Sequence, residues 1–253
     1  MMALDDALEV LASSLKGDPR VQAIFVKGSV GRGEQDKFSD LDLYCLVDPK
    51  DLDDFLQSRI RHLESYGKLL FHDDIFIVAP QILAVYEDML HVDLFTVTEK
   101  TFIEKDYFKI IHDPHHRLEK YKASQSLRLS PGEYQDAVDD IAWFLYQYKK
   151  SSARGNDLWS VNLLNQVMAH LARVLLHRYK PERAQLGIKT VKTSLPDAVI
   201  KKVLEIQENI TPQKHHSAAA YLRDFLDGEE DWIFREMPNP EKIKPLWDKV
   251  TSN

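Results

Sequence analysis

The residues with the clearest chemical potential are three aspartates in two apolar runs. Asp40 and Asp42 stand two positions apart at the start of the run 41–47, so an extended backbone would direct both carboxylates to one face. Asp93 stands inside the run 91–97, where a lone acid costs free energy unless it is paired or faces a cleft. If the two runs form neighbouring strands, the three carboxylates converge.

Three converging carboxylates suit a divalent cation. Like charges on one face repel each other, and a cation between them relieves that repulsion. Oxygen-only ligands favour Mg²⁺, which keeps several waters and takes the rest of its shell from substrate phosphates. The set therefore predicts two-metal phosphoryl transfer, with one ion on the phosphates of a nucleoside triphosphate and the other at an acceptor hydroxyl. Asp93 could also take the proton of that hydroxyl.

A glycine-rich turn precedes the aspartates. The apolar run 21–26 predicts a strand that ends at Gly28 and Ser29, where a short helix is expected to start. Gly28 lets the backbone approach a ligand without an intervening Cβ, and the free N–H groups of a helix start suit phosphate oxygens. Ser29 is suited either to cap this helix or to donate to a phosphate. Arg32 is equally suited to a phosphate and to a surface carboxylate.

The order Gly-Ser, then Ser39-Asp40-Leu41-Asp42, then a later strand aspartate resembles the signature of the DNA polymerase β-like nucleotidyltransferase superfamily. Within it, the sequence is most similar to the lincosamide and aminoglycoside nucleotidyltransferases. Residues 18–47 carry most of the resemblance, and residues 91–100 extend it. It implies that Gly28 and Ser29 hold the triphosphate, and that the three aspartates bind Mg²⁺ as two ions.

The resemblance also points to residues in the second half of the chain. Such enzymes place a lysine from the first long helix of that half near the phosphates, and Lys149 and Lys150 are the two candidates. Some aminoglycoside members carry a catalytic glutamate one turn earlier, where this chain has Leu145 and Tyr146. That base is absent from this sequence, which leaves Asp93 as the candidate base.

The elements that position these residues change character along the chain. Before residue 125, helices and short strands alternate. After Ser130-Pro131-Gly132, long helical periods take over. We predict helices at 4–15 and 52–65 and strands at 21–26, 41–47, 68–71, 75–78, 83–86 and 91–97, followed by helices at 134–152, 159–179, 196–209 and 217–226. The fold class is therefore α+β: an N-terminal nucleotidyltransferase domain (1–128) with a mixed β-sheet and flanking helices, followed by a C-terminal α-helical bundle (129–253) that binds the acceptor.

Composition excludes several other classes of protein. The net charge of −7, with scattered basic residues, argues against a long nucleic acid as substrate. No apolar run reaches the roughly 20 residues of a membrane span, and the acidic opening segment is unlike a signal peptide. The single cysteine, Cys45, predicts a buried thiol and fits a reducing cytoplasm. Histidines at 112, 115 and 116 indicate a surface loop rather than a metal cluster, and His215 and His216 are expected at the surface.

The sequence thus predicts Mg²⁺-dependent transfer of a nucleoside monophosphate, AMP from ATP in the first instance, to a hydroxyl of a small molecule. Candidate acceptors include antibiotics such as a lincosamide or an aminoglycoside, and pyrophosphate would be released. Two alternatives stay open: nucleotidylation of a protein, and a non-catalytic nucleotide-binding or toxin–antitoxin partner module. The pattern names neither the acceptor nor the preferred base, and a homodimer is one of the assemblies it allows.

Overall fold

The computed structural model describes residues 2–102 and 105–252. The chain packs as two compact units, residues 1–126 and 127–253, where the sequence predicted a division after residue 128. No helix in the described ranges is long and apolar enough to cross a membrane.

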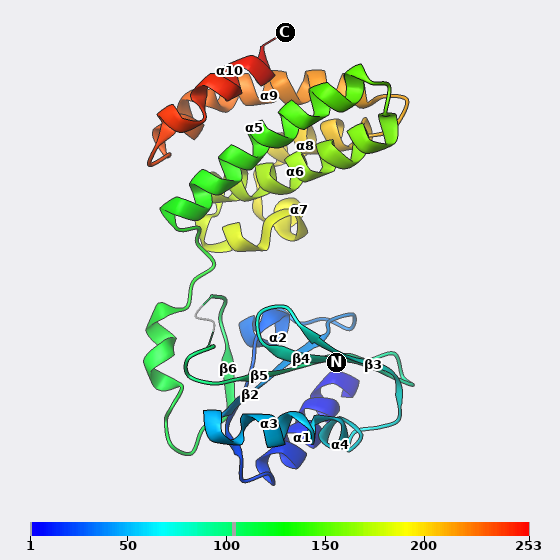
Figure 1. Ribbon diagram of the computed structural model, residues 1–253, viewed down its shortest axis with the longest axis vertical. Helices are drawn as coiled ribbons and strands as arrows, with labels where there is room; N and C mark the ends of the chain where they lie inside the picture. Colours follow the sequence, from blue (N-terminus) through cyan, green and yellow to red (C-terminus); the bar gives the residue numbers. More distant parts are fainter. Residues whose placement is uncertain (1, 103–104, 253) are drawn as a thin grey trace. The chain divides into compact units, whose positions relative to one another are not determined.

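The first unit is built on a mixed sheet with strand order β3-β4-β5-β2-β1-β6 (Figure 1). β2 and β5 are parallel, and the other neighbouring strands are antiparallel. The strands are β1 (Val21–Val26), β2 (Leu41–Val47), β3 (Leu69–Phe76), β4 (Pro80–Tyr86), β5 (His91–Val97) and β6 (Lys109–His112). The helices of this unit are α1 (Met2–Lys16), α2 (Gly28–Arg32), α3 (Leu52–Leu56) and α4 (Arg59–Leu63), with 3-10 turns at Pro49–Asp51 and Glu119–Ser124. The α+β prediction is confirmed.

The alternation along β2 sends successive side chains to two different cores. Leu41, Leu43 and Cys45 belong to a cluster that also contains residues of α1, α3 and α4. Tyr44, between them, belongs to the opposite face, where its ring stacks between those of Phe25 and Phe95 at centroid distances of 4.9 and 4.3 Å. Asp42 has the parity of Tyr44, so it belongs to this second face.

Cys45 is fully buried, and burial raises the pKa of its thiol far above the ordinary value. The thiol is therefore protonated at neutral pH and is a packing group, as the sequence predicted.

Three expected elements differ in the structure. The helix predicted over 52–65 is two short helices, α3 and α4, because the Ser58 hydroxyl donates to the Phe55 carbonyl oxygen (2.9 Å) and competes with the helical backbone there. The strands predicted at 68–71 and 75–78 are one continuous strand, β3, since the polar residues between them pair along β4. β6 was not predicted.

The second unit is entirely helical in its described part. Its helices are α5 (Pro131–Ala153), α6 (Asp157–Tyr179), α7 (Val191–Ser194), α8 (Asp197–Glu208), α9 (His215–Arg235) and α10 (Lys244–Thr251), with 3-10 segments at Pro181–Thr190 and Pro240–Lys242. A capping box starts α5, because the Ser130 hydroxyl accepts from the Glu133 N–H and the Glu133 carboxylate accepts from the Ser130 N–H. α10 was not predicted, yet it supplies Trp247, which is fully buried.

His215 corrects one expectation, since it is fully buried rather than at the surface. Its Nδ1 lies 3.0 Å from the Tyr148 hydroxyl, and its Nε2 lies 3.2 Å from the Asp157 carboxylate. A ring with a partner at each nitrogen can be buried without an unmet hydrogen bond, which is why this polar residue joins the helical core.

Candidate active site

The structure brings Asp42 and Asp93 together at the same level of two neighbouring strands. β2 and β5 run parallel, and Asp42 is the register partner of Asp93. Asp40 directly precedes β2, with the same parity as Asp42. Asp42 and Asp93 are therefore level on adjacent strands, and Asp40 is near enough for its charge to act on Asp42. Their role as metal ligands stays a prediction.

A histidine that the sequence did not single out lies among these carboxylates. His91 Nε2 lies 3.2 Å from the Asp93 carboxylate, and His91 Nδ1 lies 3.9 Å from the Asp40 carboxylate. Its side chain is 35% exposed, so solvent reaches the ring. His91 stands two positions before Asp93 on β5, and this strand alternation was the available signal for it.

The electrostatics of Asp42 reflect crowding by like charges. Burial first, and then the charges of Asp40 and Asp93, raise the pKa of Asp42 to about 6. A cation placed among these groups would relieve the repulsion and favour the ionised form.

The residues at this site fit Mg²⁺ in their chemistry. All three predicted ligands are carboxylates, and their mutual repulsion is already visible in the pKa of Asp42. In the part of the chain that the structure describes, no group of three or more His, Cys, Asp or Glu side chains is placed to hold a metal by itself.

The glycine turn sits directly against Asp42. Gly28 has a φ of +61°, and a Cβ on it would come within 1.9 Å of the Asp42 carboxylate. The Lys27 N–H donates to the Asp42 carbonyl oxygen (3.0 Å), which fixes the turn to β2. Glycine is therefore required here both by the backbone conformation and by the space that the carboxylate occupies.

Ser29 has a buried hydroxyl with no hydrogen-bond partner among the described residues. The N-terminus of α2 has no side-chain cap, so this hydroxyl does not serve as one. An unpaired buried hydroxyl costs free energy, and a ligand oxygen placed at this turn would satisfy it.

Arg32, at the end of α2, is held by two carboxylates. Its Nη1 donates to Asp106 (2.7 Å) and its Nε donates to Glu34 (3.0 Å). The sequence allowed either a phosphate or a surface carboxylate as the partner of Arg32. Among the described residues, its partners are carboxylates. Asp106 also raises the pKa of Asp42, so it is a further acid near the site. It lies far from the motif in sequence and had no local signal.

Lys27 is the third residue, after His91 and Asp106, that the motif did not identify as part of the site. Only 5% of it is exposed, and burial lowers the pKa of its ammonium to about 8, against the opposing pull of Asp106 and Asp42. The signal in the sequence was the position of this lysine directly after the apolar run 21–26.

The lysines of the second unit have partners of their own. Lys149 on α5 donates to the carbonyl oxygens of Lys249 (2.8 Å) and Ser252 (3.0 Å) at the end of α10. The Lys150 ammonium lies 5.2 Å from the centre of the Tyr146 ring. A phosphate contact by either lysine stays a prediction.

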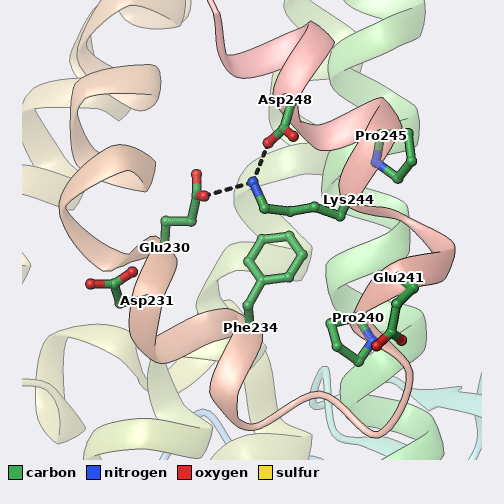
Figure 2. A pocket seen from close by; sticks show the side chains of 8 residues that line it. All are labelled: Glu230, Asp231, Phe234, Pro240, Glu241, Lys244, Pro245 and Asp248. Atoms are coloured by element: carbon green, nitrogen blue, oxygen red, sulfur yellow. Dashed lines mark hydrogen bonds and ion pairs between the residues drawn. The ribbon is translucent and has the colours of Figure 1, made fainter.

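One cavity of about 380 Å³ lies beside the carboxylates, in the first unit. Asp40 and His91 line it, together with the apolar side chains of Phe38, Met89 and Leu90. A second cavity, of about 660 Å³, lies in the helical unit between α9 and α10, with the segment Pro240–Lys242 before α10 also lining it (Figure 2). There the Lys244 ammonium forms ion pairs with the carboxylates of Glu230 and Asp248, which also line the cavity.

Comparison with solved structures gives distant likenesses. An aminoglycoside 6-adenyltransferase from Bacillus subtilis is 13% identical, with 98% of this chain and 99% of that one covered, at a TM-score of 0.36. A nucleotidyltransferase-like protein from Exiguobacterium sibiricum is 13% identical, with 92% of this chain and 79% of that one covered, at a TM-score of 0.41. A CD-NTase from Bradyrhizobium diazoefficiens, solved with GTP, is 13% identical, with 99% of this chain and 88% of that one covered, at a TM-score of 0.27. With TM-scores below 0.5, these likenesses carry no argument.

Comparison at the level of protein families is decisive. A search of curated proteins finds no match. The family model for streptomycin adenylyltransferase matches residues 1–179, which include the glycine turn, all three aspartates and the whole of α5 and α6. This confirms the nucleotidyltransferase resemblance of the motif. The chain belongs to the streptomycin adenylyltransferase family, and it is a nucleotidyltransferase.

Proposed function

We propose that this enzyme transfers AMP from ATP to a hydroxyl group of a small molecule and releases pyrophosphate, with Mg²⁺ as cofactor. The observation that carries the proposal is the parallel register of Asp42 and Asp93 beside the Gly28 turn. There the crowded Asp42 carboxylate favours a cation, and the Ser29 hydroxyl, which has no partner among the described residues, favours a phosphate oxygen. Asp40, Asp42 and Asp93 would hold the metal. When bound, Mg²⁺ would neutralise phosphate charge and lower the pKa of the acceptor hydroxyl.

The residues of the chain would each have a definite part. Gly28 and Ser29 would bind phosphate oxygens through the turn backbone and the unpaired hydroxyl. The acceptor oxygen would form a bond to the α-phosphorus while the bond to pyrophosphate breaks. Asp93 would take the proton of that hydroxyl, and His91, at 3.2 Å and open to solvent, would keep the Asp93 carboxylate oriented.

Acceptor contacts would come from the helical unit. Trp143 and Tyr146 on α5 are 49% and 37% exposed, and their ring centres are 5.7 Å apart. The two rings are tilted by 41° to each other, and exposed aromatic rings side by side on one helix offer apolar contact area to a ring-shaped ligand. A Trp143→Ala variant is expected to raise KM for the acceptor while KM for ATP stays the same.

The family description makes an aminocyclitol or aminoglycoside, streptomycin first, the leading acceptor to test, with lincosamides next. The decisive experiment is pyrophosphate release with Mg²⁺ and each nucleoside triphosphate against such a panel, beside an Asp40→Ala control. Acceptor-dependent release that the control lacks would support the proposal and name the acceptor. Nucleotide binding without release across the panel would contradict it. Labelling of a protein from a cell lysate by radioactive ATP would instead favour a protein acceptor.

A further inference from the structure

The proposed chemistry makes no use of Lys27, although this lysine directly precedes the Gly28 turn and its N–H donates to the Asp42 carbonyl oxygen. Its side chain is 5% exposed and lies above two aromatic rings, at 5.5 Å from the centre of Tyr44 and 5.2 Å from that of Phe102. Its ammonium donates to the Lys105 carbonyl oxygen at 2.9 Å. Burying an ammonium costs far more free energy than burying an apolar side chain of the same length. Packing alone therefore does not explain a lysine at this position.

The residues that Lys27 reaches form a short strap, residues 105–107, over the glycine turn. At one end of α2, Lys27 holds the Lys105 carbonyl; at the other end, Arg32 holds the Asp106 carboxylate (2.7 Å). Between them, a Cβ on Gly31 would come within 2.8 Å of the Tyr107 carbonyl oxygen. The strap is thus clamped to both ends of α2 and lies in contact with its middle.

The strap has a constrained backbone of its own. Asp106 has a φ of +66°, and its N–H donates to the Ser126 carbonyl oxygen (3.2 Å). Its carboxylate also accepts from the Tyr107 N–H (2.7 Å). A non-glycine residue held in the left-handed region by several bonds is typical of sites where the chain fixes a functional group.

We propose that Lys27 is a positioning residue for the triphosphate: by anchoring the strap at Lys105 it holds Asp106 and Arg32, and hence the α2 turn, in the arrangement that binds phosphate. This rests on the proposed function for the identity of the ligand. The Lys27 ammonium contacts the strap directly through the Lys105 carbonyl oxygen, so loss of Lys27 is expected to affect nucleotide binding before it affects metal binding.

The test compares Lys27→Met with Lys109→Met, a matched loss of one lysine from an exposed position on the neighbouring strand β6. Lys27→Met is expected to weaken binding of ATP with Mg²⁺ about tenfold, the effect of one lost hydrogen bond from a charged donor. Lys109→Met is expected to bind ATP as the wild type does, and Lys27→Arg to recover part of the loss.

Two readouts separate positioning from general damage. Mn²⁺ binding without nucleotide is expected to survive in Lys27→Met, because removing a positive charge does not weaken a cation site. Amide hydrogen exchange at residues 105–107 of the ligand-free protein is expected to speed up, and this holds whether or not ATP is the substrate. Loss of Mn²⁺ and ATP binding together would overturn the positioning role.

The remaining outcomes are also decisive. If the wild type binds ATP and Lys27→Met binds it equally well, the inference fails while the proposed function stands. If the wild type binds no nucleotide, the proposed function fails, and the exchange measurement alone decides whether Lys27 anchors the strap. If Lys27→Met does not fold, Asp106→Asn takes its place, because it weakens the contact between the strap and Arg32 at the other end of α2. Weaker ATP binding in that variant supports the inference, and unchanged binding overturns it.

Discussion

Asp42 on β2 and Asp93 on β5 are direct register partners on two parallel strands. Parallel neighbours keep equivalent residues at the same level along the sheet, so two carboxylates from distant segments meet without any loop having to place them. The rigid sheet, rather than a flexible connection, sets the geometry of the predicted metal site.

Asparagine substitutions should separate the site carboxylates from other acids on the sheet. Asp42→Asn and Asp93→Asn keep the size of the side chain and remove its charge, so turnover is expected to fall by about 100-fold or more, through lost metal binding and lost proton acceptance. Asp73→Asn, at an exposed position on the edge strand β3, is the matched control and should retain wild-type turnover. Full activity in Asp42→Asn, measured by pyrophosphate release, would end the metal assignment.

The raised pKa of Asp42, about 6, gives a stability effect of defined sign. Since the folded protein holds this proton more tightly than the unfolded chain, the resulting stability is present below the unfolded value of 3.8 and is lost as pH rises through about 6. At pH 8 without divalent cations, Asp42→Asn removes a crowded, partly buried charge, so the free energy of unfolding is expected to rise by about 1–3 kcal/mol.

Urea unfolding at two pH values checks this prediction. At pH 4 the Asp42 carboxyl is already protonated in the folded protein, so wild type and Asp42→Asn should differ little. Added Mg²⁺ at pH 8 should stabilise only the wild type, because the variant lacks a ligand. Equal stability of the two proteins at pH 8 in the absence of metal would contradict the crowding of charges at Asp42.

The strands that carry the site could be predicted from sequence because their signal is local. Short, nearly continuous apolar runs surround Asp42 and Asp93, and the bounds of β1, β2 and β5 match the predicted runs. Residues placed by long-range contacts gave no such signal. Asp106 reaches Arg32 across 74 positions, and His215 is buried because Tyr148, 67 positions away, supplies a partner. A one-dimensional pattern does not contain such pairings, so Asp106 was missed and the burial of His215 was predicted wrongly.

Two glycines with left-handed backbones make a matched test of the turn. Gly28 and Gly33 have φ values of +61° and +71°, but only at Gly28 would a Cβ strike the Asp42 carboxylate; nothing lies within 4 Å at Gly33. Gly33→Ala should therefore cost only the backbone strain, about 1 kcal/mol. Gly28→Ala should cost more and displace Asp42, so activity is expected to fall by at least about 100-fold while Gly33→Ala stays active. Similar activity losses in the two variants would show that strain alone, rather than the space of the carboxylate, governs the turn.

The last prediction concerns Asp18, a buried carboxylate whose pKa shifts in the direction opposite to that of Asp42. Asp18 accepts from Arg20 Nε (2.8 Å) and lies 3.0 Å from His62 Nε2, and the hydrogen bonds from Arg20 hold the pKa of this carboxyl well below its ordinary value. A lowered folded pKa means that the stabilisation is present above the unfolded value of 3.8 and is lost as pH falls below it. Asp18→Asn should therefore lower the free energy of unfolding at pH 7 by about 3 kcal/mol, since it leaves a partly buried guanidinium without its carboxylate.

The pH dependence of that loss distinguishes a charge effect from a packing effect. Between pH 4 and pH 2 the unfolded wild-type chain takes up a proton that the folded chain resists, so the gap between wild type and Asp18→Asn is expected to narrow as pH falls. Asp53→Asn, at an exposed position on α3, should show no such gap at any pH. Unfolding curves at pH 7, 4 and 2.5 provide the measurement. A constant gap would mean that asparagine merely packs badly at this position, whereas a narrowing gap would show that ionised Asp18, bound by Arg20, is what fastens the start of β1 to α4.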